Sequence, residues 1–335
     1  MSPSTTGGQI DQRLRELHDR HVDVVPERIA CYYTPGRGFQ AAGAEPVERQ
    51  PFAIAVRTLD GELHEVGDTA TAFALQSISK VFGYALALEE HGRDYVLERV
   101  GVEPSGDAFN SIVVDERNSR PFNPMVNAGA LVVCDMIGGR DHAEQLERSL
   151  AALRAYAANP ALEVDAATLA AELGDADRNR AILYLMRSQG MVHGDVEATL
   201  RLYLEQCSVR VTAGDLATMG ATLANGGTNP ASGERVLCRE RVRDVLSVMF
   251  TCGMYDYAGE WAFDVGLPAK SGVSGGIVCV IPGKMGVAVL SPGLDPYGNS
   301  IRGIDVCREI SERLGAHVFA GDDEDALIGT SAPAG

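Results

Sequence analysis

The chain has 335 residues, of which 45 % are hydrophobic and 22 % are charged, and its formal net charge is −17. Such a composition is typical of a soluble globular protein that is long enough for about two structural units. Proteins that bind nucleic acid or anionic membranes need a basic face. The acidic balance, together with the lack of any run of Arg and Lys, argues against both of these partners.

The seven cysteines are scattered, form no C-x-x-C pair, and several lie in apolar runs such as LVVCDM and GIVCVIP. This pattern favours reduced core thiols over a disulfide framework. The N-terminus lacks the apolar segment of a signal peptide, and no run is long enough to span a membrane. A cytoplasmic protein is therefore expected. The histidines form no H-E-x-x-H motif, and we expect no metal site.

The first elements combine helical and hairpin patterns. Residues 1–8 are small and polar and are expected to be disordered, whereas 9–32 has helical spacing. In 52–68, two alternating apolar runs are joined by Asp60 and Gly61. An Asp-Gly pair between alternating runs is the strongest short signal for a tight turn, so this segment predicts a β-hairpin.

Helical patterns follow. A helix is expected from about 77 to 92, and 123–137 begins as a Pro/Asn-marked loop and continues as an apolar helix. From about 140 to 225 Leu and Ala recur at three- and four-residue spacing, which indicates an all-helical unit. The sequence GGTNP then ends this unit.

The last part of the chain again combines helical and hairpin patterns. A helix is expected at about 238–250, a second hairpin of apolar strands at 275–293, and an amphipathic helix at about 300–315. Because the strands come as hairpins and not as βαβ units, we expect an α/β fold of the α+β kind with an antiparallel sheet. The predicted division is a disordered tail (1–8), a discontinuous sheet domain (9–138 and 226–318), a helical domain (139–225) and an acidic mobile tail (319–335).

The segment FALQSISKVFGYALAL carries an unusual lysine. Lysine occurs only at positions 80, 270 and 284. Ser77 and Lys80 are three residues apart and share a helix face, whereas Ser79 points about 100° away from Lys80. A buried lysine can lose its proton and act as a base toward a serine, which arginine cannot do. The plain alternative is that Ser77 is a helix cap and that Lys80 extends to solvent.

A second lysine favours the catalytic interpretation. Lys270, Ser271 and Gly272 form the K-[ST]-G pattern that accompanies S-x-x-K in serine acyl-transfer enzymes. Lys284 lies in a hairpin turn and is expected to be solvated. The sequence GVSGG also matches the G-x-S-x-G nucleophile elbow, but an apolar strand follows it where that motif requires a helix. Ser274 is therefore a poor candidate for the nucleophile.

These motifs belong to the β-lactamase and penicillin-binding superfamily, and the chain resembles one branch of it, the serine-dependent glutaminases. The resemblance runs from about residue 29 to about 316. It is carried by LQSISKVF, VGVEPSGDAFNSI, NPMVNAGA, DRNRAILYL, LYLEQCSV, TLANGGTNPASGERVL, CGMYDYAGEWAFDVGLPAKSGVSGGI and SPGLDPYGNSIRGI. It implies a β-lactamase/DD-peptidase-like fold, an antiparallel sheet flanked by helices plus an all-helical domain.

The resemblance also implies a set of site residues. Ser77 is expected to be the nucleophile, Lys80 its base, Tyr255 a proton shuttle and Lys270 a source of positive potential. The backbone N–H groups of Ser77 and Val273 are expected to form the oxyanion hole. The remaining positions expected to contact substrate, together with Ser77, Tyr255 and Val273, are Asn127, Glu172, Asn179, Tyr203 and Tyr32.

Several of these assignments have competing explanations. The family's V-A-D-Y-I-P segment reads IACYYTPGRGF here, so either Tyr32 or Tyr33 takes the tyrosine position; we prefer Tyr32. The loop at about 36–50 also looks longer than usual. Without the resemblance, Glu172 would be interpreted as a solvated helix carboxylate and Asn127 as a helix cap.

The expected activity is hydrolysis of L-glutamine to L-glutamate and ammonia through a γ-glutamyl-serine intermediate, with no cofactor and no metal. The family implies a homo-oligomer, either a dimer or a tetramer. A penicillin-interacting hydrolase is a second possibility, and a non-catalytic glutamine sensor is a third. The absence of a signal peptide argues against the penicillin-interacting hydrolase, and the retention of Ser77, Lys80 and Tyr255 argues against the sensor.

Overall fold

The computed structural model describes residues 3–24, 31–34, 38–41, 50–105 and 119–320. Its centre is a five-stranded antiparallel sheet with strand order β4-β3-β9-β8-β7. The strands are β3 (Ala53–Thr58), β4 (Leu63–Gly67), β7 (Ala269–Ser271), β8 (Gly276–Ile281) and β9 (Met285–Leu290). The two predicted hairpins, β3–β4 and β8–β9, are confirmed, and they join through the β3–β9 pair. The mixed α/β fold with an antiparallel sheet is therefore as expected.

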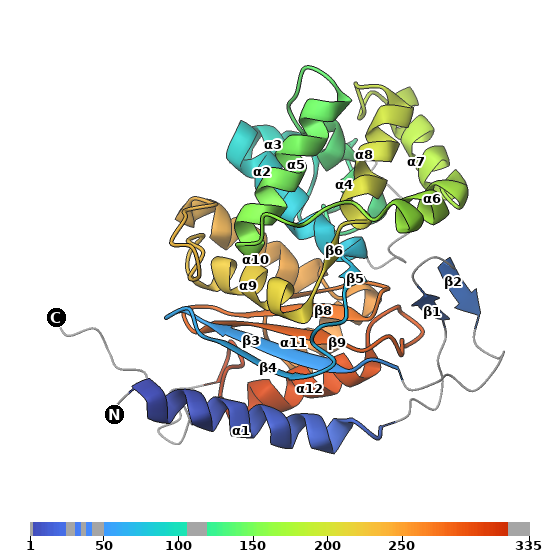
Figure 1. Ribbon diagram of the computed structural model, residues 1–335. Helices are drawn as coiled ribbons and strands as arrows, with labels where there is room; N and C mark the ends of the chain where they lie inside the picture. The colour runs from blue at the N-terminus through green and yellow to red at the C-terminus, as the bar shows by residue number, and fades with distance from the viewer. Residues whose placement is uncertain (1–2, 25–30, 35–37, 42–49, 106–118, 321–335) are drawn as a thin grey trace.

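Helices cover both faces of this sheet (Figure 1). One face carries α1 (Pro3–His21), α11 (Ala258–Asp264) and α12 (Ile301–Arg313); the other carries α9 (Ala213–Ala224), with α10 (Arg239–Cys252) nearby. All residues of β8 and β9 are buried. Strands covered on both faces are continuously apolar, which explains the sequences GIVCVI and MGVAVL.

A second, helical layer lies beyond α9 and α10 (Figure 1). It contains α2 (Ser79–His91), α3 (Arg93–Arg99), α4 (Asn127–Met136), α5 (His142–Ala157), α6 (Ala166–Gly174), α7 (Asp177–Ser188) and α8 (Val196–Cys207). A short 3₁₀ turn, η1 (Gln76–Ile78), precedes α2, and η2 (Tyr255–Tyr257) precedes α11. Two small strand pairs complete the described elements, β1 (Cys31–Thr34) with β2 (Gly38–Ala41) and β5 (Phe73–Ala74) with β6 (Arg210–Val211).

The N-terminal helix differs from its expectation at both ends. It begins at Pro3, within the segment expected to be disordered, and it ends at His21, well before residue 32. Proline is well suited to the first position of a helix, which has no partner for an N–H group. The sequence after His21, VDVVP, contains β-branched residues and a proline, which do not favour continuation. Strand β2 lies within the stretch expected to be a loop.

Helix α9 has a different neighbour from the one its sequence position suggests. It is predicted within the helical unit, but it packs across the sheet against β9, β3 and β8. The contact is close at Gly286 of β9, where an added Cβ atom would lie 2.1 Å from the backbone nitrogen of Ala221. A Cβ atom added at Gly220 of α9 would likewise lie 3.0 Å from the side chain of Val278 in β8. The proposed division into a sheet domain and a helical domain remains a prediction, and the tail residues 321–335 lie outside the described part.

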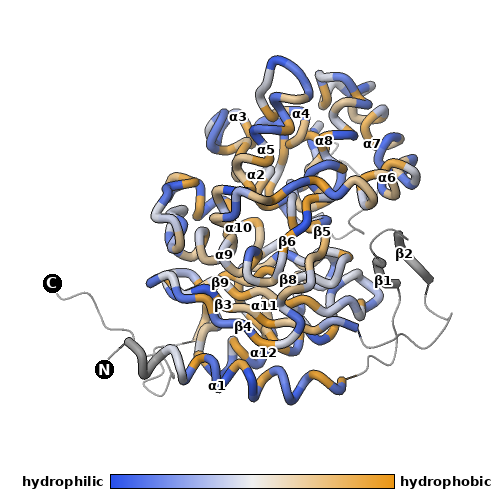
Figure 2. Tube along the Cα trace, viewed as in Figure 1, coloured by the Kyte–Doolittle hydropathy of each residue, from blue (hydrophilic) through white to orange (hydrophobic). Residues whose placement is uncertain are grey.

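The colouring by hydropathy locates the core (Figure 2). Apolar residues concentrate on the central strands and on the helix faces directed toward them. One large cluster joins the helical layer to one face of the sheet, and a second fills the space under α1 and α12. None of the helices in the described ranges is both long and apolar enough to cross a bilayer.

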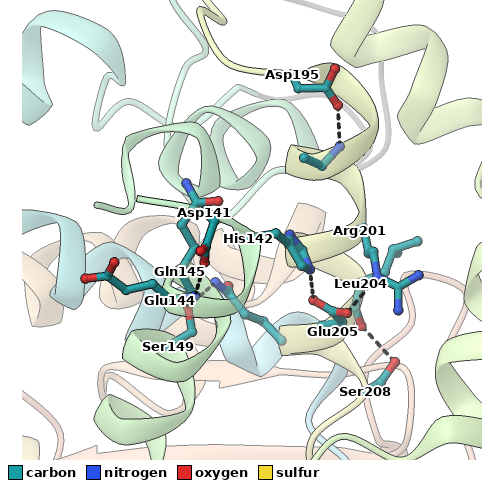
Figure 3. Close-up of polar contacts among 12 residues, drawn as sticks. Asp141, His142, Glu144, Gln145, Ser149, Asp195, Arg201, Leu204, Glu205 and Ser208 are labelled. Carbon is teal, nitrogen blue, oxygen red and sulfur yellow. Dashed lines mark hydrogen bonds and ion pairs between the residues drawn. The ribbon is translucent and has the colours of Figure 1, made fainter. Parts of the chain in front are cut away.

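Helices α5 and α8 are joined by a buried carboxylate (Figure 3). Glu205 of α8 accepts a hydrogen bond from Nε of Arg201 at 2.9 Å, and its other oxygen lies 2.8 Å from Nε2 of His142 at the start of α5. The side chain of Glu205 is only 4 % exposed, whereas Arg201 is 51 % exposed. A buried carboxylate needs such partners to offset the loss of its hydration.

Replacing Glu205 with Ala should lower the free energy of unfolding by about 2 kcal/mol, because two charge-assisted contacts are lost, one to Arg201 within α8 and one to His142 of α5. The cost is moderate because Arg201 and His142 can regain contact with water. Chemical denaturation measures this change. Glu197→Ala is the control, since Glu197 is a largely exposed residue of the same helix paired with Arg180, and it should unfold like the wild type. Equal stability of both variants would contradict the structural role of Glu205.

Candidate active site

Ser77 lies in the η1 turn directly before α2, at the junction of the helical layer with the sheet. Its side chain and that of Lys80 are buried, and Nζ of Lys80 donates a hydrogen bond to Oγ of Ser77 at 3.1 Å. The three-residue spacing thus places the two groups together, as helical geometry predicts. The hydroxyl of Ser79 instead donates to the backbone oxygen of Gln76 at 2.8 Å.

The Lys80 amine contacts Ser77 on one side and α4 on the other. Its ammonium nitrogen also donates to Oδ1 of Asn127, the first residue of α4, at 2.7 Å. Burial lowers the pKa of Lys80 from 10.5 to about 8, because the charged form loses its hydration. The neutral form of Lys80, which a base requires, is therefore far more accessible near physiological pH than that of a solvated lysine.

Asn127 connects Lys80 to two further expected site residues. Its Nδ2 atom donates to Oδ1 of Asn179 on α7 at 2.9 Å, and the Tyr203 hydroxyl of α8 donates to its Oδ1 at 3.4 Å. The Tyr203 ring centroid lies 6.0 Å from Nζ of Lys80. Burial raises the pKa of Tyr203, so its hydroxyl keeps its proton and remains a donor.

Strand β7 brings the second lysine to the same place. Nζ of Lys270 donates to the backbone oxygen of Ser271 at 2.6 Å and lies 3.9 Å from the centre of the Tyr255 ring. The Tyr255 hydroxyl donates to the same oxygen at 3.2 Å and is also hydrogen-bonded to the Ser77 side chain. Burial, and then the nearby Lys80, lowers the pKa of Lys270 well below its ordinary value. Burial raises the pKa of Tyr255 to about 12.

Glu172 reaches the site through a residue that the sequence analysis missed. Its Oε1 atom accepts a hydrogen bond from Nε2 of Gln76 at 2.8 Å. Gln76 directly precedes Ser77 and has φ of 51°, a left-handed conformation that is uncommon for a residue with a side chain. Burial raises the pKa of Glu172, although the hydrogen bond from Gln76 opposes this shift. No motif marks Gln76; only its position beside the serine gives a sequence signal.

The segment after β7 places Val273 and Ser274. Val273 is 9 % exposed and follows the K-S-G residues at the end of the strand. Ser274 stands two residues before β8, so the turn lacks the strand-then-helix arrangement of a nucleophile elbow. The structure therefore agrees with the rejection of Ser274.

Tyr32 and Tyr33 both lie in β1, where their backbones pair with Gln40 and Phe39 of β2. Their side chains are outside the described part of the chain, so the preference for Tyr32 remains a prediction. Among the described residues, no group of three or more His, Cys, Asp or Glu side chains is placed to hold a metal ion.

The arrangement has the components of serine acyl transfer. A buried hydroxyl contacts a buried amine of lowered pKa, and a tyrosine hydroxyl is hydrogen-bonded to the serine side chain. A second buried amine, that of Lys270, lies over the Tyr255 ring, and a carboxylate and amide groups surround the site. Side chains of this kind can bind a small zwitterionic molecule by charge-assisted hydrogen bonds.

Comparisons with known proteins agree with this chemistry. The family model of the glutaminases matches residues 44–319. The glutaminase of Trichormus variabilis is 49 % identical over 306 residues, which cover 91 % of this chain and 89 % of the relative. The glutaminase of Microcystis aeruginosa is 48 % identical over 323 residues, covering 95 % and 93 %.

Solved structures give the same result. A probable glutaminase, ybaS, superposes with a TM-score of 0.86 at 35 % identity, covering 94 % of this chain and 99 % of the other. A Bacillus glutaminase superposes with a TM-score of 0.80 at 31 % identity, covering 94 % and 100 %. Sequence and fold are therefore similar over nearly the whole length of both partners, and the chain belongs to the glutaminase family.

Proposed function

We propose that this glutaminase hydrolyses the side-chain amide of L-glutamine through a γ-glutamyl ester on Ser77, with Lys80 as the base. The observation that carries this proposal is the 3.1 Å contact between Nζ of Lys80 and Oγ of Ser77, together with the lowered pKa of Lys80. A lysine placed only for structure or solubility has no need of such burial beside a hydroxyl.

In the first half-reaction, Ser77 Oγ attacks the amide carbon while neutral Lys80 takes the hydroxyl proton. Negative charge develops on the former amide oxygen and is stabilised by the backbone N–H groups of Ser77 and Val273. The carbon–nitrogen bond then breaks. Tyr255, whose hydroxyl lies beside Ser77, passes a proton to the departing nitrogen, which leaves as ammonia.

In the second half-reaction, water attacks the ester carbon. Its proton is taken by the Lys80–Tyr255 pair, the carbon–oxygen bond to the serine breaks, and Ser77 regains its proton. The product is L-glutamate. In its protonated form, Lys270 adds positive potential on the side of Tyr255.

The α-ammonium and the other polar groups of glutamine have proposed hydrogen-bond partners in the site. Glu172 accepts hydrogen bonds from the α-ammonium of glutamine, and Gln76 holds this carboxylate in place. Asn127, Asn179 and Tyr203 form one hydrogen-bonded group beside Lys80 and supply polar contacts to the rest of the substrate. Tyr32 is proposed as a further contact on the resemblance alone.

The test is ammonia release by the purified protein from L-glutamine, L-asparagine and γ-glutamyl amides. Glutamine should be hydrolysed, and asparagine should react about 10- to 200-fold more slowly in kcat/KM, because it is one methylene shorter. When the ammonium group of asparagine is bound to Glu172, the amide carbon of asparagine does not reach Oγ of Ser77. Binding of glutamine by calorimetry without ammonia release would indicate a sensor, and acylation by a fluorescent penicillin would indicate a penicillin hydrolase.

We also propose that the protein is a cytoplasmic homo-oligomer, a dimer or a tetramer. The cytoplasmic assignment is supported by the free cysteines among the described residues, most of them buried, since a reducing compartment keeps such thiols unpaired. Analytical ultracentrifugation of the full chain measures the oligomeric state.

A further inference from the structure

The turn segment 294–300, between β9 and α12, has a tightly hydrogen-bonded structure. Its ends form a bridge between Leu294 and Ser300, and the backbone N–H of Asp295 donates to the oxygen of Asn299 at 2.8 Å. The Asp295 carboxylate accepts from the backbone N–H groups of Tyr297 and Asn299, at 2.9 and 2.8 Å. These hydrogen bonds restrain the backbone of Asn299.

The side chain of Asn299 is completely buried and uses both ends of its amide. Its Oδ1 atom accepts a hydrogen bond from the Ser271 hydroxyl at 2.5 Å. Its Nδ2 atom donates to the backbone oxygen of Met254 at 3.4 Å and to the Asp295 carboxylate at 3.3 Å. One side chain therefore connects β7 to the segment that precedes η2.

These two partners lie on either side of Tyr255. Met254 is the residue before it, and the backbone oxygen of Ser271 accepts the Tyr255 hydroxyl at 3.2 Å. The same oxygen accepts the Lys270 ammonium at 2.6 Å. Asn299 thus holds the residue that precedes the Tyr255 backbone and the residue that receives its hydroxyl.

Tyr255 needs such support because its backbone is strained. Its φ of 55° lies in the left-handed region, which residues with a side chain adopt at a cost in free energy. Such a conformation persists only where the surroundings hold it. The turn segment is also adjacent, since a Cβ added at Gly298 would lie 3.7 Å from the Tyr255 ring and 3.4 Å from the Val273 side chain.

We infer that Asn299 is a positioning residue for the reaction: it holds the Tyr255 hydroxyl beside Ser77 by fixing Met254 and Ser271. The inference rests on the proposed role of Tyr255 in proton transfer. Nothing in the S-x-x-K or K-[ST]-G motifs indicates it. Loss of Asn299 should release the strained turn, displace the hydroxyl and slow chemistry, while the groups around Glu172 that bind the substrate stay in place.

The experiment compares Asn299→Ala in the wild-type and Tyr255→Phe backgrounds. In the wild type, kcat for glutamine should fall about 10- to 100-fold, the usual effect of misplacing a catalytic group by about 1 Å, with KM changed by less than about threefold. In the Tyr255→Phe background, where the hydroxyl is already absent, the same substitution should change kcat by less than about threefold.

The matched control is Asn229→Ala. Asn229 is equally buried and also fixes a loop, donating to the backbone oxygens of Ala155 and Tyr156 at 2.9 Å. This control should lower the melting temperature and leave kcat near the wild-type value. If Asn299→Ala does not fold, Ser271→Ala, which removes one hydroxyl from the same contact, should give a smaller loss of kcat that also disappears in the Tyr255→Phe background.

Three results would overturn the inference, and the third is distinguishable from the first two. An equal loss of kcat in both backgrounds, or a similar loss for Asn229→Ala, would mean that Asn299 only stabilises the fold. A Tyr255→Phe enzyme with wild-type kcat would contradict the proposed role of Tyr255 itself, and the inference with it.

Discussion

Replacing Ser77 with Ala is expected to abolish ammonia release from glutamine, lowering kcat by at least about 10⁴-fold. The substitution removes the only atom proposed to form the acyl bond, and it leaves the hydrogen bond from Lys80 without its acceptor. An alanine fits this site without strain, since it is smaller than serine. The variant should therefore still fold and bind glutamine, which calorimetry and a steady-state ammonia assay can measure together.

Ser79→Ala is the matched control, because this serine is also buried and lies only two residues away. Its hydroxyl donates to the backbone oxygen of Gln76 and contacts the sulfur of Cys207, 3.6 Å away. Losing these contacts should destabilise the turn slightly and leave much of the activity. An active Ser77→Ala enzyme, or an inactive Ser79→Ala enzyme that still folds, would reverse the assignment of the nucleophile.

The sequence predicts those features that depend on neighbours along the chain. Asp60 and Gly61 lie at the turn between β3 and β4, and the alternating apolar residues on either side form the paired strands. Ser77 and Lys80 meet because three residues make about one helical turn. In each case, local geometry decides which side chains come together.

Contacts between segments that are far apart in the sequence cannot be predicted from local spacing. The contact between Lys80 and Asn127 joins residues 47 positions apart, and that between Gln76 and Glu172 joins residues 96 apart. No periodicity encodes such distances, and the resemblance to glutaminases supplies Asn127 and Glu172 without explaining how they are held. Asn299 contains no catalytic chemistry of its own, so only its contacts in the fold mark it.

Helix α9 illustrates the same limit for the fold. Its spacing of apolar residues identifies a helix but does not indicate which element that helix covers. The contact with β9 depends on the small residue Gly286 in the strand, which allows the helix backbone to approach closely. A helical period and a glycine in a distant strand cannot be related to each other until the sheet is known.

Lys80→Arg is expected to lower kcat by about 10³-fold, even though it keeps a positive charge and a donor near Ser77. Arginine stays protonated at every pH at which the protein is folded, so it cannot take the serine proton. The same reasoning gives a pH dependence for the wild type. Only neutral Lys80 is a base, so kcat/KM should rise with pH and level off above about 8, the pKa that burial gives to Lys80.

The direction of this rise follows from the cause of the shift. Burial disfavours the charged ammonium, which lowers the pKa and moves the rise from near 10.5 to about 8. Lys284→Arg is the control, because Lys284 lies in the turn between β8 and β9 and should keep both the rate and the pH profile of the wild type. A Lys80→Arg enzyme with near wild-type kcat, or with residual activity that still rises near pH 8, would contradict the role of Lys80. In the second case, another group would be the base, and the buried Lys270 would be the first to examine, because it is the other amine within the same hydrogen-bonded group as Tyr255.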